Sequence, residues 1–130
     1  EAADRFLMVP EYLNYLLTGH MVNEYTNATT TNLVNARTCT WDSFALEAAE
    51  APARLFGEIA MPGTVVGGLA PEVQQRVGFD ARVMLPATHD TGSAFLAVPA
   101  RDAQAVYLSS GTWSLLGVEH EGPITSDASR

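Results

Sequence analysis

The sequence predicts an α/β fold, and two observations support this prediction. Residues typical of helix boundaries bracket apolar stretches at helical spacing: a proline opens and a glycine follows the stretches at residues 10–19 and 71–78. In the second half, strand-like and helix-like stretches alternate before two strand-like stretches that a short turn separates. This order indicates an α/β or α+β class, and no internal repeat is present.

The first half is predicted to form short helices joined by extended segments. Residues 10–17 are predicted to be helical, and residues 21–31, rich in β-branched side chains, to be extended before a second helical stretch. Asp42 and Ser43 can cap a helix that runs to residue 49, because their oxygens can accept hydrogen bonds from free amides. Residues 60–70, with two glycine-containing turns, are predicted to be a long exposed loop or an irregular strand.

The second half has a clearer rhythm. We expect a strand over residues 82–86, a helix over 91–98, and strands over 105–109 and 113–119. Residues 110–112 are short enough for a hairpin turn between the last two strands. Residues 99–104 are a candidate domain boundary.

Composition excludes several classes of partner. The chain has 7 basic and 15 acidic side chains, a net charge of -8, which repels nucleic-acid phosphates and anionic lipid surfaces. No apolar run approaches the length that spans a bilayer. The single cysteine, Cys39, cannot form an internal disulfide, and with three scattered histidines it offers no metal-ligand spacing. We therefore expect a cytoplasmic protein that binds neither nucleic acid nor membranes and has no metal site formed by these residues.

Two short motifs could carry chemistry. His89-Asp90-Thr91 lies where a strand is predicted to end and a helix to begin, the edge at which open α/β sheets bind ligands. Ser109-Ser110-Gly111-Thr112 offers hydroxyls and a tight turn whose backbone amides could bind a phosphate. Simpler interpretations stay open, because Asp90 could be only a helix cap and the turn only a hairpin. The turn lacks the lysine of a Walker A loop.

Aromatic and threonine residues elsewhere favour structural roles. Trp41 and Trp113 are predicted to lie in the core, because the aromatic residues show no periodic stripe. Threonines 29–31 could hydrogen-bond a ligand, but threonine is also common in strands for its β-propensity alone.

Taken together, the longer stretches resemble one family. Residues 22–31 (Val-Asn-Glu-Tyr-Thr-Asn-Ala-Thr-Thr-Thr), His89-Asp90-Thr91 and residues 109–117 (Ser-Ser-Gly-Thr-Trp-Ser-Leu-Leu-Gly) resemble segments of the FGGY carbohydrate kinases. Within that family, the histidine before Asp90 and the full 109–117 string are most similar to the branch that phosphorylates L-rhamnulose in rhamnose catabolism. The branch that acts on L-fuculose is the nearest rival.

The resemblance implies a fold, a domain division and roles for single residues. It implies the actin-like ATPase fold, with residues 1–100 ending the sugar-binding N-terminal domain and residues 101–130 beginning the nucleotide-binding C-terminal domain. Asp90 then matches the catalytic base, and His89 and Thr91 flank it at the sugar site. Gly111 and Thr112 match the ATP-binding turn, and Mg²⁺ would accompany the ATP.

The same resemblance implies that the sequence is an internal fragment. The family's first phosphate-binding loop and its adenine pocket have no counterpart in these residues, so we expect the fragment alone to be inactive and poorly stable. A non-catalytic ligand-binding module of the actin-like superfamily remains an alternative, in which Asp90 only caps a helix. A hydrolase using His89 with Ser110 or Ser114 lacks the expected Gly-x-Ser-x-Gly motif. The oligomeric state stays open.

Overall fold

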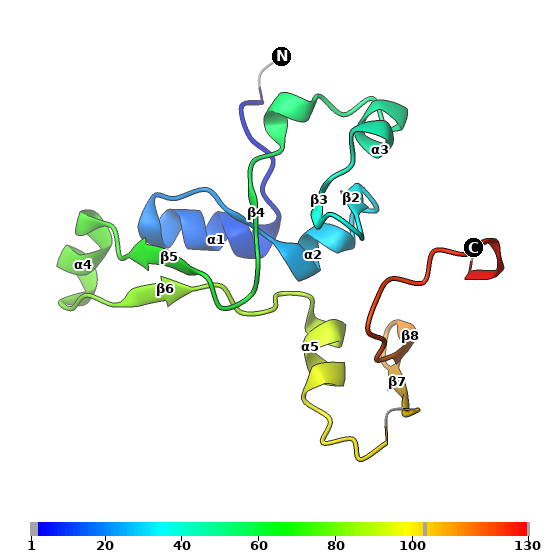
Figure 1. Cartoon of the computed structure of the whole chain (residues 1–130). Helices are drawn as coiled ribbons and strands as arrows, with labels where there is room; N and C mark the ends of the chain where they lie inside the picture. The colour runs from blue at the N-terminus through cyan, green and yellow to red at the C-terminus, as the bar shows by residue number, and fades with distance from the viewer. Residues whose placement is uncertain (1–2, 103, 130) are drawn as a thin grey trace. The chain divides into compact units, whose positions relative to one another are not determined.

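The computed structural model describes residues 3–102 and 104–129, which divide into two compact units, Glu1–His89 and Asp90–Arg130 (Figure 1). The first unit contains α1 (Val9–Thr18), β1 (Asn23–Glu24), α2 (Tyr25–Thr29), β2 (Val34–Asn35), β3 (Thr40–Trp41), α3 (Ser43–Ala48), η1 (Ala53–Leu55), β4 (Ile59–Ala60), β5 (Val65–Gly68), α4 (Pro71–Val77) and β6 (Arg82–Met84). The second contains α5 (Asp90–Leu96), β7 (Val106–Ser110), β8 (Ser114–Val118) and η2 (Asp127–Ser129). The mixed α/β class is confirmed.

The predicted proline and glycine boundaries of α1 and α4 are confirmed. Each helix has its proline in the first two positions and ends at a left-handed glycine, Gly19 with φ 78° and Gly78 with φ 81°. The amide of Gly19 donates to the carbonyl of Tyr15 at 2.7 Å, and that of Gly78 to Gln74 at 2.8 Å. Glycine suits this position because a Cβ disfavours positive φ.

Acidic side chains cap α2 and α3. Asp42 accepts a hydrogen bond from the amide of Ala45 at 3.0 Å, as predicted for the start of α3. This amide, together with the side chain of Asn35, holds the pKa of Asp42 below its ordinary value. Glu24 caps α2 in the same way, through the amides of Thr26 and Asn27.

The strands that the structure describes pair two by two. β1 and β4 are parallel, whereas β2–β3, β5–β6 and β7–β8 are antiparallel. The expectation that β6 ends at the edge of an open sheet is therefore wrong for the described residues, because β6 pairs only with β5. The register of that pair shifts between Val65 and Gly67, so the segment predicted as a loop or an irregular strand contains a bulged strand.

Polar side chains fill much of the buried interior of the first unit. α1 contacts β5 and β6, which lie beside it in Figure 1. Among the described residues of the first unit, the buried apolar side chains are those of Ala28, Leu46 and Leu85. The buried polar side chains are Glu11, Thr18, Asn23, Glu24 and Asn27. Burying polar atoms is costly unless they are hydrogen-bonded, and in the described part of the chain every buried side-chain nitrogen and oxygen has a partner.

Three aromatic rings form a cluster in the first unit. The ring centroid of Phe56 lies 5.0 Å from that of Phe6 and 4.8 Å from that of Trp41, whose indole nitrogen donates to the carbonyl of Gly57 at 2.6 Å. The predicted packing role of Trp41 is consistent with this half-buried position. The same prediction for Trp113 is wrong, because its side chain is 79% exposed, in the turn between β7 and β8.

In the second unit, Phe95 packs α5 against the hairpin. The ring of Phe95 stacks on that of Tyr107 with centroids 5.4 Å apart, and it also lies directly over Gly117. Tyr107 is buried, and its hydroxyl donates to the carboxylate of Glu119 at 2.9 Å. The helix that begins at Asp90 and the hairpin that carries the 111–113 turn are thus in contact within one unit.

Candidate active site

A buried carboxylate lies beside the chain that precedes Asp90. Glu24, at the junction of β1 and α2, is fully buried. Its Oε2 accepts hydrogen bonds from the amide of Thr88 at 3.1 Å and from the Thr88 hydroxyl at 2.8 Å. It also accepts bonds from the hydroxyl of Thr26 at 2.5 Å and the amide of Asn27 at 3.0 Å, while Oε1 accepts from the amide of Thr26 at 2.8 Å.

A second buried carboxylate adjoins the first. Glu11, on α1, is 1% exposed. Its oxygens accept from the side-chain amide of Asn27 at 3.3 and 3.4 Å and from the hydroxyl of Thr88 at 3.3 Å. Since a hydroxyl has one proton, the shorter bond of Thr88 to Glu24 is the stronger candidate for donation. Three segments, at residues 11, 24–27 and 88, are joined in one network.

The network favours an ionised Glu24. Burial alone would raise its pKa, but the hydrogen bonds donated by the hydroxyl and amide of Thr26 and by the amide and hydroxyl of Thr88 outweigh burial and hold the pKa below its ordinary value. A carboxylate only accepts hydrogen bonds, and every partner described here can donate.

The backbone of His89 is held by the same network. Its amide donates to the hydroxyl oxygen of Thr26 at 3.2 Å, while that hydroxyl donates to Glu24. His89 is half-buried and ends the first compact unit. Asp90, the next residue, is the first residue of α5 and is exposed.

Asp90 makes local contacts at the start of its helix. Its Oδ1 accepts from the amide of Thr91 at 2.7 Å and lies 3.4 Å from the Thr91 hydroxyl. A helix cap normally accepts from amides two or three residues further on, so the bond to Thr91 differs from that of an ordinary cap. An exposed carboxylate at a helix start is accessible to a substrate hydroxyl.

The predicted phosphate-binding turn forms the tip of the β7–β8 hairpin. Ser110 pairs with Ser114, so residues 111–113 make the turn, and both Gly111 and Thr112 are exposed. The amide of Gly111 donates to the carbonyl of Trp113 at 2.9 Å. In this conformation the Gly111 amide already donates its hydrogen bond to Trp113. A phosphate could accept a bond from this amide only if the turn opened, and would otherwise have to be bound by Thr112.

The threonine run closes α2 rather than forming a strand. The hydroxyls of Thr29, Thr30 and Thr31 each donate to the backbone carbonyl three residues earlier, at 2.7 Å. Their placement in a strand was therefore wrong. Threonine hydroxyls at a helix end can bond the preceding turn in this way, which explains why the β-branched pattern misled.

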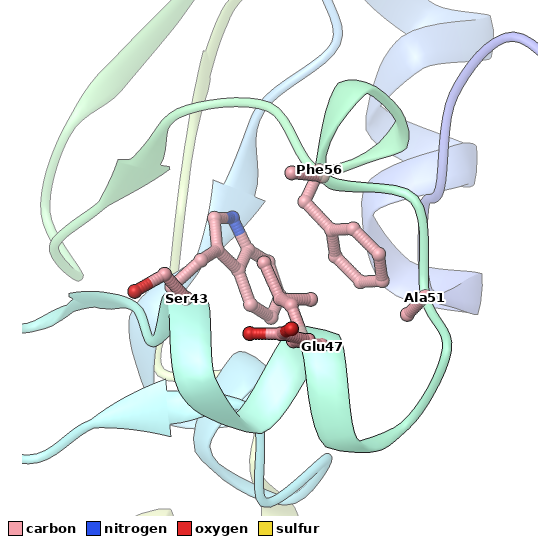
Figure 2. A pocket seen from close by; sticks show the side chains of 7 residues that line it. Ser43, Glu47, Ala51 and Phe56 are labelled. Carbon is pink, nitrogen blue, oxygen red and sulfur yellow. The ribbon is translucent and has the colours of Figure 1, made fainter.

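A separate pocket lies in the first unit. It has a volume of about 400 Å³, and its lining residues are Trp41, Ser43, Leu46, Glu47, Ala51, Ala53 and Phe56. The rings of Trp41 and Phe56 contact each other in this lining, and Figure 2 shows Ser43 and Glu47 on α3 beside Phe56. None of the residues predicted to carry chemistry lines it. Among the described residues no group of three or more His, Cys, Asp or Glu side chains could hold a metal ion.

Comparison with known proteins decides the family. The sequence profile of the FGGY family of carbohydrate kinases, N-terminal domain, matches residues 1–97. The chain belongs to the FGGY family of carbohydrate kinases. The resemblance inferred from the sequence motifs is thus confirmed. In the part of this FGGY chain that the structure describes, no helix is both long and apolar enough to cross a membrane.

Curated relatives of this FGGY chain include several rhamnulokinases. The enzyme of Oceanobacillus iheyensis is 56% identical over 124 residues, 95% of this chain and 26% of that protein. That of Halalkalibacterium halodurans is 56% identical over 122 residues, 94% of this chain and 26% of the relative. That of Bacteroides thetaiotaomicron is 50% identical over 125 residues, with 95% and 26% covered. The chain spans about a quarter of the length of these relatives.

Solved structures agree with the family assignment. The crystal structure of ligand-bound xylulose kinase from Lactobacillus acidophilus matches with a TM-score of 0.83 and 26% identity, covering 97% of this chain and 26% of that one. A carbohydrate kinase from Novosphingobium aromaticivorans matches with a TM-score of 0.64 and 29% identity, covering 82% and 24%. The described fold is therefore that of a segment of an FGGY kinase.

Sequence reasoning missed the carboxylate network beneath the motif. Glu11, Asn27 and Thr88 carry no local signal, because their contacts join segments far apart in the chain. Glu24 precedes a helix, but glutamate is not among the preferred capping residues. A hint was available, because Glu24 and Asn27 both lie within residues 22–31, the stretch that resembles the family.

Proposed function

We propose that a protein of the relatives' full length that contains this chain is a rhamnulokinase, which transfers the γ-phosphoryl group of ATP to L-rhamnulose and forms L-rhamnulose 1-phosphate. The observation that carries the proposal is the identity of 50–56% to rhamnulokinases of three organisms over nearly the whole chain. The matching xylulose kinase is only 26% identical, which favours rhamnulose over xylulose as the sugar.

In the proposed reaction Asp90 is the general base. A sugar hydroxyl is a weak nucleophile, and a carboxylate within hydrogen-bond reach accepts its proton as the oxygen attacks the γ-phosphorus in line. The exposed carboxylate of Asp90 at the start of α5 suits this role. His89 and Thr91, the neighbours of Asp90 in the chain, would contact the sugar and orient the attacking hydroxyl.

The nucleotide would be bound from the hairpin. The Thr112 hydroxyl and the amides of residues 111–112 are donors that can stabilise charge on the phosphoryl oxygens, provided the Gly111 amide is released from Trp113. Mg²⁺ is usually bound by substrate phosphates together with one or two carboxylates, and it neutralises phosphate charge. The described residues form no group of three or more potential metal ligands, so the phosphates of the nucleotide, with water, would provide most of the ligands of the ion.

The wider architecture is part of the proposal. Residues 1–100 would end the sugar-binding domain, and residues 101–130 would begin the nucleotide-binding domain, of an actin-like ATPase fold. The family match over residues 1–97 supports the first assignment. The net charge of -8 argues against binding to nucleic acid or anionic membranes, and the single cysteine suits a reducing cytoplasm.

The test is an ADP-release assay on the full-length protein with L-rhamnulose, L-fuculose, D-xylulose or glycerol as the acceptor. We expect L-rhamnulose to give the highest kcat/KM and Asp90→Asn to reduce it by about 10²- to 10⁴-fold, the usual contribution of a general base. Asp102→Asn is the matched control, because Asp102 is an exposed carboxylate of the same unit that bonds only the nearby Gln104 amide among the described contacts.

The other possible results of the ADP-release assay distinguish the alternatives. A preference for L-fuculose would keep the mechanism and change the sugar. Sugar-dependent ADP release that survives Asp90→Asn would remove Asp90 from the role of base. If ligands bind but no acceptor gives ADP release, the protein is a non-catalytic binding module.

A further inference from the structure

One buried carboxylate fixes the two residues before the proposed base. Glu24 receives two hydrogen bonds from Thr88, a residue 64 positions away, and through the Thr26 hydroxyl it reaches the amide of His89. The distances are 2.8 and 3.1 Å to Thr88, 2.5 Å from Thr26 to Glu24, and 3.2 Å from His89 to Thr26.

Hydrogen bonds of this kind restrain direction as well as position. The Thr88 backbone amide and side-chain hydroxyl bond to the same oxygen of Glu24, so both the backbone and the χ1 angle of Thr88 are restrained. The next amide, of His89, is held by a second bond. Asp90 is the next residue, so the chain that leads into its backbone is restrained as far as the His89 amide.

Burial makes these restraints strong. Glu24 is 0% exposed, so water does not compete for its oxygens, and hydrogen bonds to a buried ion are stronger than those at the surface. Local capping of α2 accounts for only part of the set, because the amides of Thr26 and Asn27 satisfy that need. The two bonds to Thr88 serve a segment outside the helix.

We infer that Glu24 and Thr88 are positioning residues, which hold the Thr88–His89 backbone so that Asp90 presents its carboxylate to the sugar hydroxyl. The inference rests on the proposed kinase function. Its consequence is a change in turnover rather than in nucleotide affinity, because Glu24 is fully buried and the nucleotide is proposed to bind at residues 111–112.

The test compares two substitutions at Thr88 in the full-length protein. Thr88→Val keeps the shape of the side chain and removes the hydroxyl that bridges the two carboxylates, whereas Thr88→Ser keeps the hydroxyl. Because a misplacement of about 1 Å can cost about 100-fold in rate, we expect kcat to fall by about 10- to 100-fold in Thr88→Val. Thr88→Ser should stay within about 3-fold of wild type, and KM for ATP should change by less than about 2-fold in both.

Glu24→Gln tests the carboxylate itself. The glutamine amide would place a donor against a donor, either at the Thr26 amide or at the Thr88 groups. Asp42→Asn is the matched control, because Asp42 is also an acidic helix cap in the first unit, and it bonds Ala45 and Asn35 instead of Thr88. We expect kcat to fall in Glu24→Gln and to stay within about 2-fold of wild type in Asp42→Asn.

The readouts separate positioning from folding. Rates are divided by the number of ATP-binding sites measured by calorimetry, so that loss of folded protein does not imitate loss of turnover. If Thr88 and Glu24 have only a structural role, their variants will have fewer ATP-binding sites and a lower melting temperature, but kcat per site will be unchanged. If Thr88→Val does not fold, Thr26→Val replaces it, because it removes the hydroxyl that holds the His89 amide.

The possible results are distinct. A wild-type protein without sugar-dependent ADP release defeats the proposed function, and the positioning role with it. Active wild type with equal kcat per site in Thr88→Val and Thr88→Ser overturns the positioning role alone. Failure of both valine variants to fold also overturns it, because the network would then be structural. A fall of kcat per site in Thr88→Val, rescued by serine, supports it.

Discussion

Replacement of Gly117 by alanine is expected to disturb the contact between α5 and the β7–β8 hairpin. A Cβ at this position would lie 2.5 Å from Cε2 and 2.9 Å from Cδ2 of the Phe95 ring. The optimal separation of two non-bonded carbon atoms is about 3.5–4.0 Å. The Phe95 ring must therefore move by about 1 Å. It cannot move freely, because the same ring also stacks on the buried ring of Tyr107, with centroids 5.4 Å apart.

The cost follows from overpacking. Forcing an extra methyl group into a packed contact destabilises proteins by about 1–3 kcal/mol, and the backbone of Gly117 adds no strain of its own, because its φ is not positive. Hydrogen exchange of the β7–β8 amides in the full-length protein measures the change, since local opening exposes them. A destabilisation of about 1–3 kcal/mol corresponds to exchange about 5- to 150-fold faster.

Two further variants decide whether the phenylalanine is responsible. Gly122→Ala is the matched control, because a Cβ there meets open space, and it should leave exchange unchanged. In a Phe95→Leu background, Gly117→Ala should cost less, because the smaller side chain leaves room. Equal exchange in Gly117→Ala and Gly122→Ala would refute the steric argument.

Two other predictions concern pH and a helix end. The lowered pKa of Glu24 means that its contribution to the free energy of unfolding is fully present above the ordinary glutamate pKa of about 4.3 and is lost as the pH falls through the folded-state value. The difference in urea midpoint between wild type and Glu24→Gln should therefore narrow between about pH 7 and about pH 3; a constant difference would contradict the assignment. Gly78→Ala should lower stability by about 1 kcal/mol, because alanine disfavours the φ of 81° that ends α4. Urea unfolding measures this, and a midpoint equal to that of Gly122→Ala would count against it.

Helix boundaries were predictable because their causes are local. Proline at the start and glycine at the end of α1 and α4 act within a few residues, and so does the Asp42 cap of α3. The hairpin of β7 and β8 was predictable for the same reason, since a short turn separates two apolar stretches. The predicted boundaries of these elements differ from those in the structure by at most one residue.

Pairing and burial were harder to predict because their causes are distant in the sequence. The parallel pairing of β1 with β4 joins Asn23 to Ile59, and nothing in either dipeptide indicates the other. Trp113 was predicted to lie in the core because the aromatic residues show no periodic stripe, but a hairpin tip exposes its side chains unless another segment covers them. The role proposed for residues 89–91 rests on their residue types and the family resemblance, while the expectation of an open sheet at this position is wrong for the described residues.

The hydrogen bonds of Glu24 and Glu11 to Thr88 were the hardest part of the candidate site to find in the sequence. They can nevertheless matter most for the geometry of the residues that follow Thr88. Apolar side chains such as Leu85 tolerate small rotations and shifts, because dispersion contacts have little directional preference. A buried carboxylate with five donors tolerates little movement, since each lost bond leaves a charged oxygen without compensation. A general base must hold its oxygen within hydrogen-bond distance of one proton. If Asp90 is the base, as we propose, the directional contacts at Thr88 and His89 lie directly before it, where we expect a small shift of the backbone to have the greatest effect on the rate.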